Sequence, residues 1–114
     1  MPTPRPGSRV RGSRSGRPIM AALDLLGRRW ALRILWELRA GALSFRALRE
    51  ACGDVSPAVL NTRLAELREA GLVESTDAGY ATTGDGRSLC RALEPLSTWA
   101  QRWSRRLDLV RTPA

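Results

Sequence analysis

The sequence predicts a mainly α-helical domain with one small β-hairpin (α+β), and three observations lead to this fold class. Two stretches in the middle of the chain carry apolar residues at helical spacing and are separated by a tight turn. Two short strand-like segments follow directly. A long segment with a regular apolar seam then continues almost to the C-terminus. With 114 residues, the chain is long enough for one such domain and a tail.

The first expected helix runs from Ile19 to Leu26. Its apolar run is short and Asp24 interrupts it, so it does not fit a signal peptide. No run in the chain approaches the ~20 apolar residues that a membrane-spanning helix needs. We therefore expect a cytoplasmic protein without a membrane partner.

Two further helices and a tight turn are expected between Ser44 and Gly71. Ser44 can cap the first helix, whose apolar positions recur at helical spacing, and Gly53 with Asp54 supplies the break after it. Those apolar positions are Phe45, Leu48 and Cys52. This arrangement predicts a helix-turn-helix, although any antiparallel pair of helices also buries an apolar stripe.

The second helix of this pair has a sharply divided surface. Ser56 caps it, Pro57 takes the first helical position, where a missing N–H costs nothing, and Gly71 ends it. Its buried stripe consists of Leu60, Leu64 and Leu67. The opposite side consists of Ala58, Thr62, Ala65 and Glu69, with Asn61 and Arg63 on the two shoulders. A small, polar and basic N-terminal half of this kind fits the major groove of DNA.

A β-hairpin is expected directly after this helix. Residues 72–74 and 80–82 are the expected strands, residues 76–79 form the turn, and Thr83 can cap another helix. A hairpin between the second helix of the pair and a third is characteristic of winged-helix folds. It therefore favours a winged helix-turn-helix over a simple helical pair.

The C-terminal segment predicts a long helix with more apolar surface than one small domain can bury. Its four-three spacing comprises Leu89, Leu93, Leu96, Ala100, Trp103, Leu107 and Val110. Pro95 lies within this pattern and is expected to kink or break the helix. The seam favours additional dimerisation helices, and the candidate interface residues are Leu23, Leu96, Trp99, Trp103 and Leu107. For the two tryptophans a second interpretation stays open, in which they complete their own subunit's core against Trp30, Ile34 and Leu38.

The composition favours a nucleic-acid partner. The 19 basic residues, all arginine, and the 11 acidic residues give a net charge of +8 and a pI of about 11.4. Residues 1–17 are Pro, Gly, Ser and Arg with almost nothing to bury, so a disordered basic arm is expected. Its five arginines give it +5: Arg5, Arg9, Arg11, Arg14 and Arg17. The arm either follows DNA or is a passive solubilising extension.

The sequence predicts no enzyme, no cofactor and no metal site. Without His or Lys, a serine or cysteine nucleophile lacks its usual base, and zinc lacks its commonest nitrogen ligand. Cys52 and Cys90 are far apart and unaccompanied by other potential ligands. The Gly-Asp-Gly run at residues 84–86 is too short for a phosphate loop and is expected to open the C-terminal helix.

Several segments together resemble one known family. They are ALDLLGRRWALRILWEL at residues 22–38, SFRALREA at 44–51, VSPAVLNTRLAELREAGLVE at 55–74, YATTGDGRSL at 80–89 and WAQRW at 99–103. The chain resembles the HxlR family of bacterial winged helix-turn-helix transcription regulators, relatives of the MarR group. The match covers about residues 18–107, so we expect an HxlR-type domain at 18–110 and a short tail at 111–114. The resemblance implies a homodimer that binds a near-palindromic operator and represses or activates a neighbouring gene.

Three positions depart from the family pattern. In members of this family the domain usually begins with a cysteine before a proline, and in some members that thiol detects oxidants or electrophiles. Here Arg17 precedes Pro18 instead. The expected wing is short and has no arginine between Val73 and Tyr80. Ala58 stands where relatives often have a lysine. We therefore expect no thiol sensing at residue 17 and one DNA contact fewer.

The resulting hypothesis is a dimeric DNA-binding regulator at the nucleoid, with the helix from Ser56 to Ala70 in the major groove. Its DNA-binding candidates are Ser44, Arg46, Arg49, Ser56, Pro57, Ala58, Asn61, Thr62 and Arg63. The serines are expected at phosphates, residues 61–63 at base edges or the backbone, and the other two arginines at the backbone. One alternative is a protein-interaction module on a winged-helix scaffold, and another is nonspecific binding of RNA or DNA through the arm. The sequence identifies no small-molecule effector.

Overall fold

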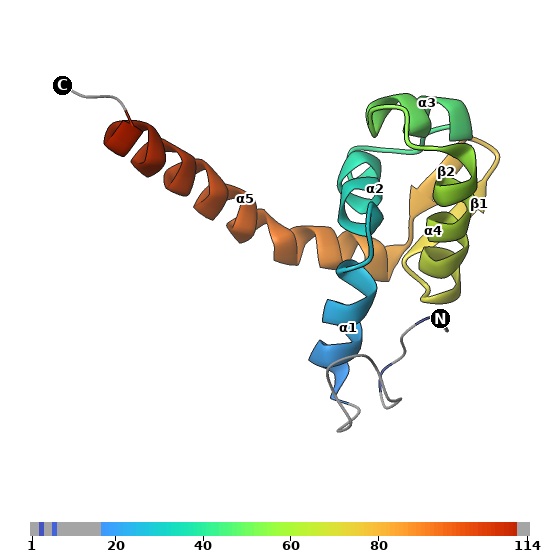
Figure 1. Cartoon of the computed structure of the whole chain (residues 1–114). Coiled ribbons are helices and arrows are strands. Elements are labelled where there is room, and N and C mark those ends of the chain that lie inside the picture. The colour runs from blue at the N-terminus through green and yellow to red at the C-terminus, as the bar shows by residue number, and fades with distance from the viewer. Residues whose placement is uncertain (1–2, 4–5, 7–16, 112–114) are drawn as a thin grey trace.

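A computed structural model describes Thr3, Pro6 and residues 17–111, with the side chains of residues 110 and 111 left out. Helices α1 to α4 and a two-stranded hairpin form one body, and the long helix α5 projects from it (Figure 1). In chain order the elements are α1 (Pro18–Leu26), α2 (Ala31–Leu38), α3 (Phe45–Ala51), α4 (Pro57–Glu69), β1 (Val73–Thr76), β2 (Gly79–Thr82) and α5 (Gly84–Arg111). No helix among the described residues has the length and apolar character needed to cross a membrane. The mainly helical fold with a hairpin is confirmed.

Local sequence signals set the ends of α3 and α4. The Oγ of Ser44 accepts a hydrogen bond from the Ala47 N–H at 3.1 Å, and the Oγ of Ser56 accepts one from the Val59 N–H at 3.2 Å. Pro57 takes the first position of α4, and Gly71 follows the helix with a φ of +78°. The expected caps of both helices are therefore confirmed.

The core lies where α2, α3 and α4 meet. Leu48 of α3 and Leu60 and Leu67 of α4 are all fully buried. They pack with the apolar side of α2, which contributes Ile34, Leu35 and Leu38, and the same cluster includes Leu64 and Val73. The leucine stripe that the sequence predicts for α4 is thus the side that faces the core, and the opposite side stays exposed.

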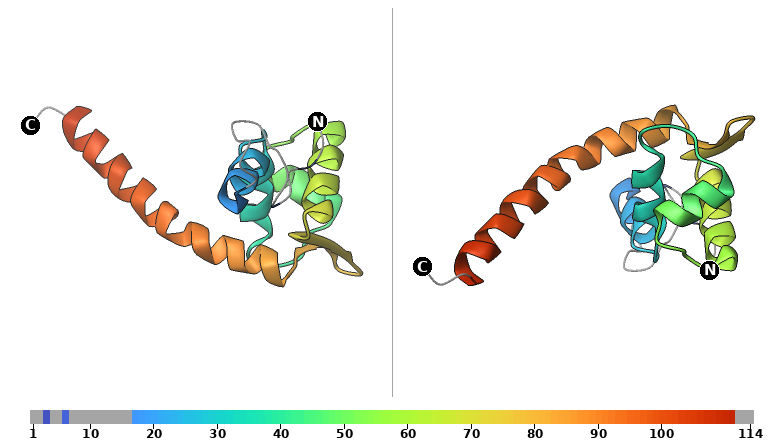
Figure 2. Two further views of the ribbon diagram at one scale, coloured as in Figure 1. Left: turned by 90° about the horizontal axis from the view of Figure 1, so that it is seen from below. Right: turned by 90° about the horizontal axis from the view of Figure 1, so that it is seen from above.

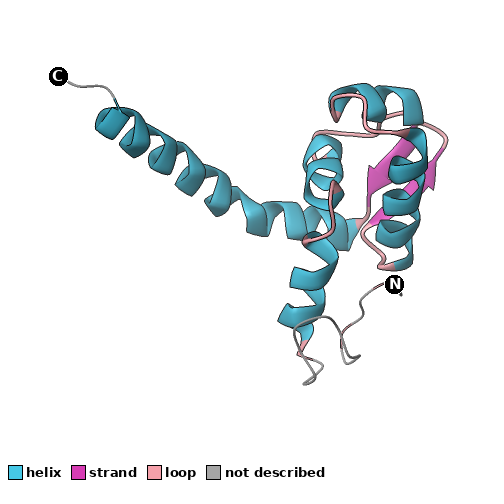
Figure 3. Ribbon diagram, viewed as in Figure 1, coloured by secondary structure: helices cyan, strands magenta, loops and turns pink. Residues whose placement is uncertain are grey.

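The hairpin has the expected position but longer strands (Figure 3). Val73 pairs with Thr82 and Thr76 with Gly79, so residues 77 and 78 alone form the turn. The segment before α3 joins the hairpin through a backbone bridge between Leu43 and Tyr80. Gly79 has a φ of +119°, and a Cβ there would lie 2.4 Å from the Leu43 carbonyl oxygen, so this close approach requires glycine.

Helix α5 begins where the sequence predicts and runs to the end of the predicted seam. The Oγ1 of Thr83 accepts a hydrogen bond from the Gly86 N–H at 3.1 Å. The helix then runs through Pro95 without a break, so of the two expected outcomes, a kink or a break, the break is wrong, and Figure 2 shows a continuous, curved helix. Pro95 and Arg91 are both exposed, so the helix faces solvent around the proline.

The distal part of α5 does not belong to the core of its own subunit. Trp99 and Trp103 are 46% and 47% exposed. Their rings stack on each other with centroids 5.4 Å apart. The interpretation that they complete the core is therefore wrong, because the body closes over Ile34 and Leu38 without them.

Candidate nucleic-acid interface

The exposed side of α4 is the central feature of the candidate site. The side that the sequence predicts as outward-facing is exposed along its whole length: Ala58, Thr62, Ala65 and Glu69. Asn61 is exposed on one shoulder of this side. Glu69 is its only acidic residue and lies in the last turn, since Glu66 points to the body and its side chain is 12% exposed. The N-terminal half of α4 therefore presents no negative charge to a polyanion.

The start of α4 adds hydrogen-bond donors. Ser56 and Pro57 are exposed. The Ser56 oxygen already accepts the capping hydrogen bond, which leaves its hydroxyl hydrogen available as a donor. With the first backbone N–H groups of the helix, this end favours a phosphate oxygen. Ser44 is exposed in the corresponding position before α3.

The polar side chains on α4 differ in their remaining hydrogen-bonding capacity. The Oγ1 of Thr62 donates to the Ala58 carbonyl at 3.0 Å, so its hydrogen is used within the helix while its oxygen still accepts. Asn61 offers both an amide donor and an acceptor on its exposed shoulder. Of these two residues, Asn61 has the larger capacity for contacts with base edges.

Arg46 and Arg49 occupy different environments on α3. The side chain of Arg46 is 91% exposed and pairs with Glu50, at 3.4 Å, on the same helix. Arg49 is half-buried, and its Nε donates to the Val55 carbonyl at 2.8 Å. Arg46 is thus accessible to an external phosphate, whereas Arg49 holds the turn between α3 and α4.

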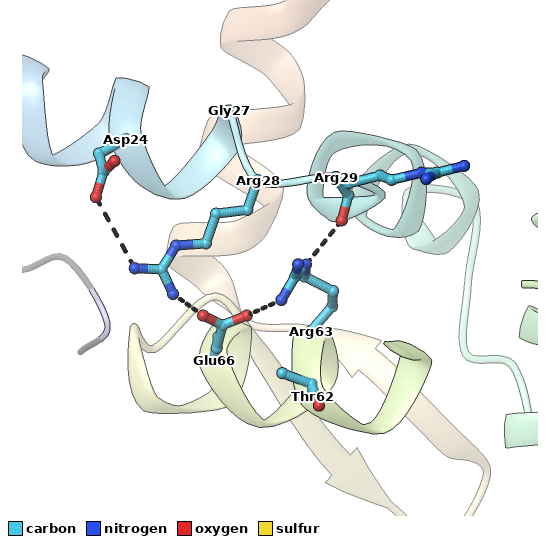
Figure 4. A pocket seen from close by; sticks show the side chains of 7 residues that line it. All are labelled: Asp24, Gly27, Arg28, Arg29, Thr62, Arg63 and Glu66. Atoms are coloured by element: carbon cyan, nitrogen blue, oxygen red, sulfur yellow. Dashed lines mark hydrogen bonds and ion pairs between the residues drawn. The ribbon is translucent and has the colours of Figure 1, made fainter. Parts of the chain in front are cut away.

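Arg63 lies on the other shoulder of α4 and turns toward the corner between α1 and α2 (Figure 4). Its Nε donates to the Arg29 carbonyl at 2.7 Å, and its Nη1 donates to Glu66 at 2.7 Å. A polar cavity of about 420 Å³ lies here, lined by Asp24, Gly27, Arg28, Arg29, Thr62, Arg63 and Glu66. The guanidinium of Arg63 is therefore occupied within the protein and directed away from the exposed side of α4.

The wing, formed by β1 and β2, is fully described, whereas only part of the basic arm, residues 1–17, is. Residues 74–78 of the wing are exposed and include Glu74 and Asp77 but no basic residue. Of the arm, Thr3 lies beside α4, and its Oγ1 donates to Glu69 at 2.8 Å. Arg17 is exposed directly before α1. The other four arginines predicted for the arm, Arg5, Arg9, Arg11 and Arg14, lie outside the described residues.

The interface candidates form two exposed apolar groups. Leu23 is 56% exposed on α1, and Leu96 is 53% exposed on α5, together with the tryptophan stack. Leu107 is half-buried on the same helix. A cavity of about 410 Å³ separates α5 from α2 near Leu96 and Trp36. These groups are among the apolar surfaces that the core of one subunit leaves uncovered.

The two cysteines are buried and unpaired. Burial raises the pKa of Cys52 above its usual 9.0, against the opposing effect of Arg33. Burial likewise raises the pKa of Cys90, whose Sγ contacts the Leu35 carbonyl oxygen at 3.6 Å. Among the described residues, no group of three or more His, Cys, Asp or Glu side chains is arranged to hold a metal ion.

Sequence reasoning missed Glu66, which binds Arg63, and Arg28, which binds Glu66. Glu66 bridges Arg63 and Arg28, which comes from the turn between α1 and α2. The three-residue spacing from Arg63 to Glu66 was a visible signal for a helical ion pair. The partnership with Arg28 had no local signal, because the two positions are 38 residues apart in the sequence.

Comparison with known proteins gives consistent results. A family model described as HxlR-like helix-turn-helix matches residues 25–108. The chain is 32% identical over 89 residues to YvaP, an HTH-type transcriptional regulator of Bacillus subtilis, covering 72% of this chain and 82% of that protein. It is 28% identical over 89 residues to an HTH-type transcriptional regulator of Methanocaldococcus jannaschii, covering 74% of this chain and 83% of the other.

Solved structures share the fold. Quinone-bound YodB of Bacillus subtilis superposes with a TM-score of 0.69 at 30% identity, covering 74% of this chain and 96% of that one. A possible HxlR-family factor of Thermoplasma volcanium superposes with a TM-score of 0.67 at 28% identity, covering 77% of this chain and 85% of that one. A MarR-family regulator of Enterococcus faecalis superposes with a TM-score of 0.69 at 25% identity, covering 89% of this chain and 98% of that one. Relatives and fold thus agree with the exposed α4, and the chain belongs to the HxlR-like family of DNA-binding, winged helix-turn-helix transcription regulators.

Proposed function

We propose that the protein acts as a homodimer on a near-palindromic DNA operator, with α4 of each subunit in a major groove. The exposed side of α4 carries the proposal, because it is free of acidic residues from Pro57 to Ala65. An α-helix fits the major groove when its outward residues are small or polar, as Ala58, Thr62 and Ala65 are. The net charge of +8 supplies a general attraction to the phosphate backbone.

In this arrangement each accessible candidate has a distinct role. The start of α4 at Ser56 contacts a phosphate, and Arg46 contacts the backbone from α3. Asn61 contacts base edges, where an amide recognises adenine with a pair of hydrogen bonds. Arg63 and Arg49 act within the protein, because their guanidinium groups already bind the Arg29 and Val55 carbonyls.

Replacing Asn61 with Ala tests this assignment. We expect a loss of about 1–3 kcal/mol in binding to the preferred site, with a relaxed sequence preference, because one set of base contacts disappears. The preferred site is first selected from random DNA, and affinities are then measured on that site and on random duplex. Thr98→Ala, an exposed polar-to-Ala change on α5, is the matched control. If Asn61→Ala keeps the wild-type ratio of the two affinities, α4 does not read the sequence.

The dimer is supported by the exposed apolar groups on α1 and α5. A palindromic operator requires two copies of α4 held about one helical turn of DNA apart, and a two-fold dimer provides that spacing. Leu23 on α1 and Leu96 and Trp103 on α5 are each about half exposed in the single chain. Contact with a second copy would cover them at low cost, because obligate interfaces are as apolar as a core.

The basic arm is proposed to follow the DNA backbone beside α4. The hydrogen bond from Thr3 to Glu69, at the end of the exposed side of α4, supports this position. Deleting residues 1–17 should lower the affinity for all sequences and flatten the salt dependence, since each arginine contact with a phosphate contributes about 0.9 to the slope of log affinity against log salt. Specificity should survive. An unchanged slope would show that the arm is a passive extension.

A protein-interaction module on the same scaffold is the second candidate function. It is favoured by a wing whose exposed residues 74–78 include two acids and no base, and by Ala58 at the start of α4. Such a module would show no preferred site in a selection from random DNA. Retained binding of random DNA through the arm alone would instead favour nonspecific nucleic-acid binding.

A further inference from the structure

We propose that Arg28 and Glu66 are positioning residues, which fix the orientation of α4 so that its exposed side meets DNA in register. The inference rests on the proposed function, because it concerns how α4 is held for sequence recognition. Glu66 lies on the side of α4 that faces the corner between α1 and α2, and its carboxylate meets two guanidinium groups there.

These contacts form a closed ring (Figure 4). One oxygen of Glu66 pairs with Arg28, and the other accepts from Arg63 Nη1 at 2.7 Å. Arg63 Nε in turn donates to the Arg29 carbonyl at 2.7 Å. Because Arg28 and Arg29 are consecutive, the backbone between α1 and α2 closes the ring. Two attachment points on α4, one turn apart, therefore bind two adjacent points on the α1–α2 corner.

The ring is better shielded from water than the described ion pairs within α2 and α3. The side chains of Arg28 and Glu66 are 11% and 12% exposed. The Arg46–Glu50 pair is 91% and 64% exposed and lies within one helix, so it fixes no element against another. Charge-assisted hydrogen bonds at low exposure hold a defined geometry. The ring thus resists rotation of α4 about its own axis. The leucine stripe alone resists this rotation less, because apolar packing is not directional.

The ring also lies between the two surfaces that the proposed function requires. Arg63 directly follows Thr62, which lies on the exposed side of α4. On α1, Asp24 directly follows Leu23, an interface candidate, and its Oδ2 lies 3.9 Å from Arg28 Nη2. In a dimer that uses α1, the ring therefore connects the helix that contacts the partner with the helix that contacts DNA. Small rotations of α4 would change the spacing of the two copies on an operator.

Glu66→Gln tests the proposal against a matched variant. Glu37→Gln also removes one carboxylate from an ion pair, with Arg33 at 3.1 Å, but that pair lies within α2. The readout is the ratio of the affinity for the selected operator to the affinity for random duplex. Glu66→Gln should lower this ratio about tenfold or more, the equivalent of one base contact. Glu37→Gln should leave the ratio within about twofold of wild type, the range of ordinary surface substitutions.

A purely structural role predicts a different result. Loss of folded protein reduces binding to both DNAs alike, so the ratio stays at the wild-type value, and that outcome overturns the proposal. Arg28→Lys is the second variant, because it keeps a charge opposite Glu66 but loses the forked contact with Asp24 and Glu66. Its ratio should fall between those of wild type and Glu66→Gln.

Combining the two changes separates a shared role from two independent ones. In the double variant Arg28→Lys/Glu66→Gln, the ratio should be no lower than in Glu66→Gln alone, because the contact is already lost. If the two substitutions lowered the ratio independently, so that their fold-changes multiplied in the double variant, the proposal would be overturned. If Glu66→Gln failed to fold, a wild-type ratio in Arg28→Lys would overturn it as well. A wild-type protein with no operator preference would overturn the proposed function as well, whereas an unchanged ratio in Glu66→Gln overturns this inference alone.

Discussion

Apolar residues are buried in the body of the molecule but exposed on the distal part of α5. In the body, which comprises α1 to α4 and the hairpin, Ile34, Leu35 and Leu60 are completely buried. On α5 beyond Pro95, Leu96, Trp99 and Trp103 are 53%, 46% and 47% exposed. The comparison shows that one chain buries the core of its own body, whereas the apolar seam of the distal α5 stays uncovered in the single chain.

The difference follows from the lengths of the helices. Helix α3 has 7 residues and α4 has 13, so each depends for stability on the core that it shares with α2. Helix α5 has 28 residues and propagates beyond the point where the body supports it. The packed part of α5 ends near Leu93, and the seam continues without a partner from the same subunit.

The largest expected effect is on the body. Leu60→Ala should lower the free energy of unfolding by about 2–5 kcal/mol, because it removes a fully buried side chain and leaves a cavity. Leu109→Ala is the same substitution at a helical position that is 78% exposed, and it should change stability by less than about 0.5 kcal/mol. Urea unfolding of both variants measures the difference. Equal losses would contradict the contrast between body and distal α5.

The next effect concerns the seam of α5. Trp103→Ala should cost about 2 kcal/mol or more of dimer stability, roughly a 30-fold rise in the dimer Kd, because buried tryptophans dominate such interfaces. Leu107→Glu should split the dimer, since an unpaired charge in an apolar interface is costly. Sedimentation measures the oligomeric state, and circular dichroism confirms the fold.

The matched control for this prediction is Leu109→Glu. It places the same charge on the same helix, at a position that is 78% exposed and lies outside the four-three spacing of the seam. It should leave the dimer intact. A wild type that is monomeric at micromolar concentration, or a Leu107→Glu variant that remains a folded dimer, would refute the proposed interface.

The sequence predicted the features of this molecule that depend on neighbouring residues. The caps at Ser44, Ser56 and Thr83 are read from side chains within three residues of their partners. The same is true of the exposed side of α4, because helical periodicity alone separates Leu60 from Thr62. These local signals fixed the α3–α4 unit and the start of α5.

Features that depend on distant partners were not predictable in this way. Arg63 lies on the shoulder that the helical wheel assigned, but its role depends on the Arg29 carbonyl, 34 residues away. The tryptophans of α5 fitted both a core and an interface, since both surfaces are apolar, and only the three-dimensional arrangement shows that the body is closed without them. The continuity of α5 through Pro95 likewise had no local signal, since a proline inside a helix removes one backbone hydrogen bond and commonly bends or ends it.

The smallest expected effect is oxidation, because both cysteines are buried on the packed side of the comparison. Cys52 ends α3 within the body, and Cys90 lies where α5 joins it. Burial raises both pKa values above 9.0, so both thiols stay protonated at neutral pH, whereas an unfolded chain ionises them near pH 9. Their contribution to stability is therefore complete below pH 9 and is lost as the pH rises from there toward the folded-state pKa.

A protonated, buried thiol is a poor nucleophile, so peroxide at pH 7 should leave operator affinity unchanged. The Cys52→Ser/Cys90→Ser double variant should bind DNA identically with and without peroxide, at a modest cost in stability from placing hydroxyls in apolar sites. Thiol alkylation of the folded wild type should be slow at pH 7 and accelerate only above pH 9, while urea exposes both thiols at once. An operator affinity that falls on oxidation in the wild type but not in the double variant would show that one of these positions is a sensor.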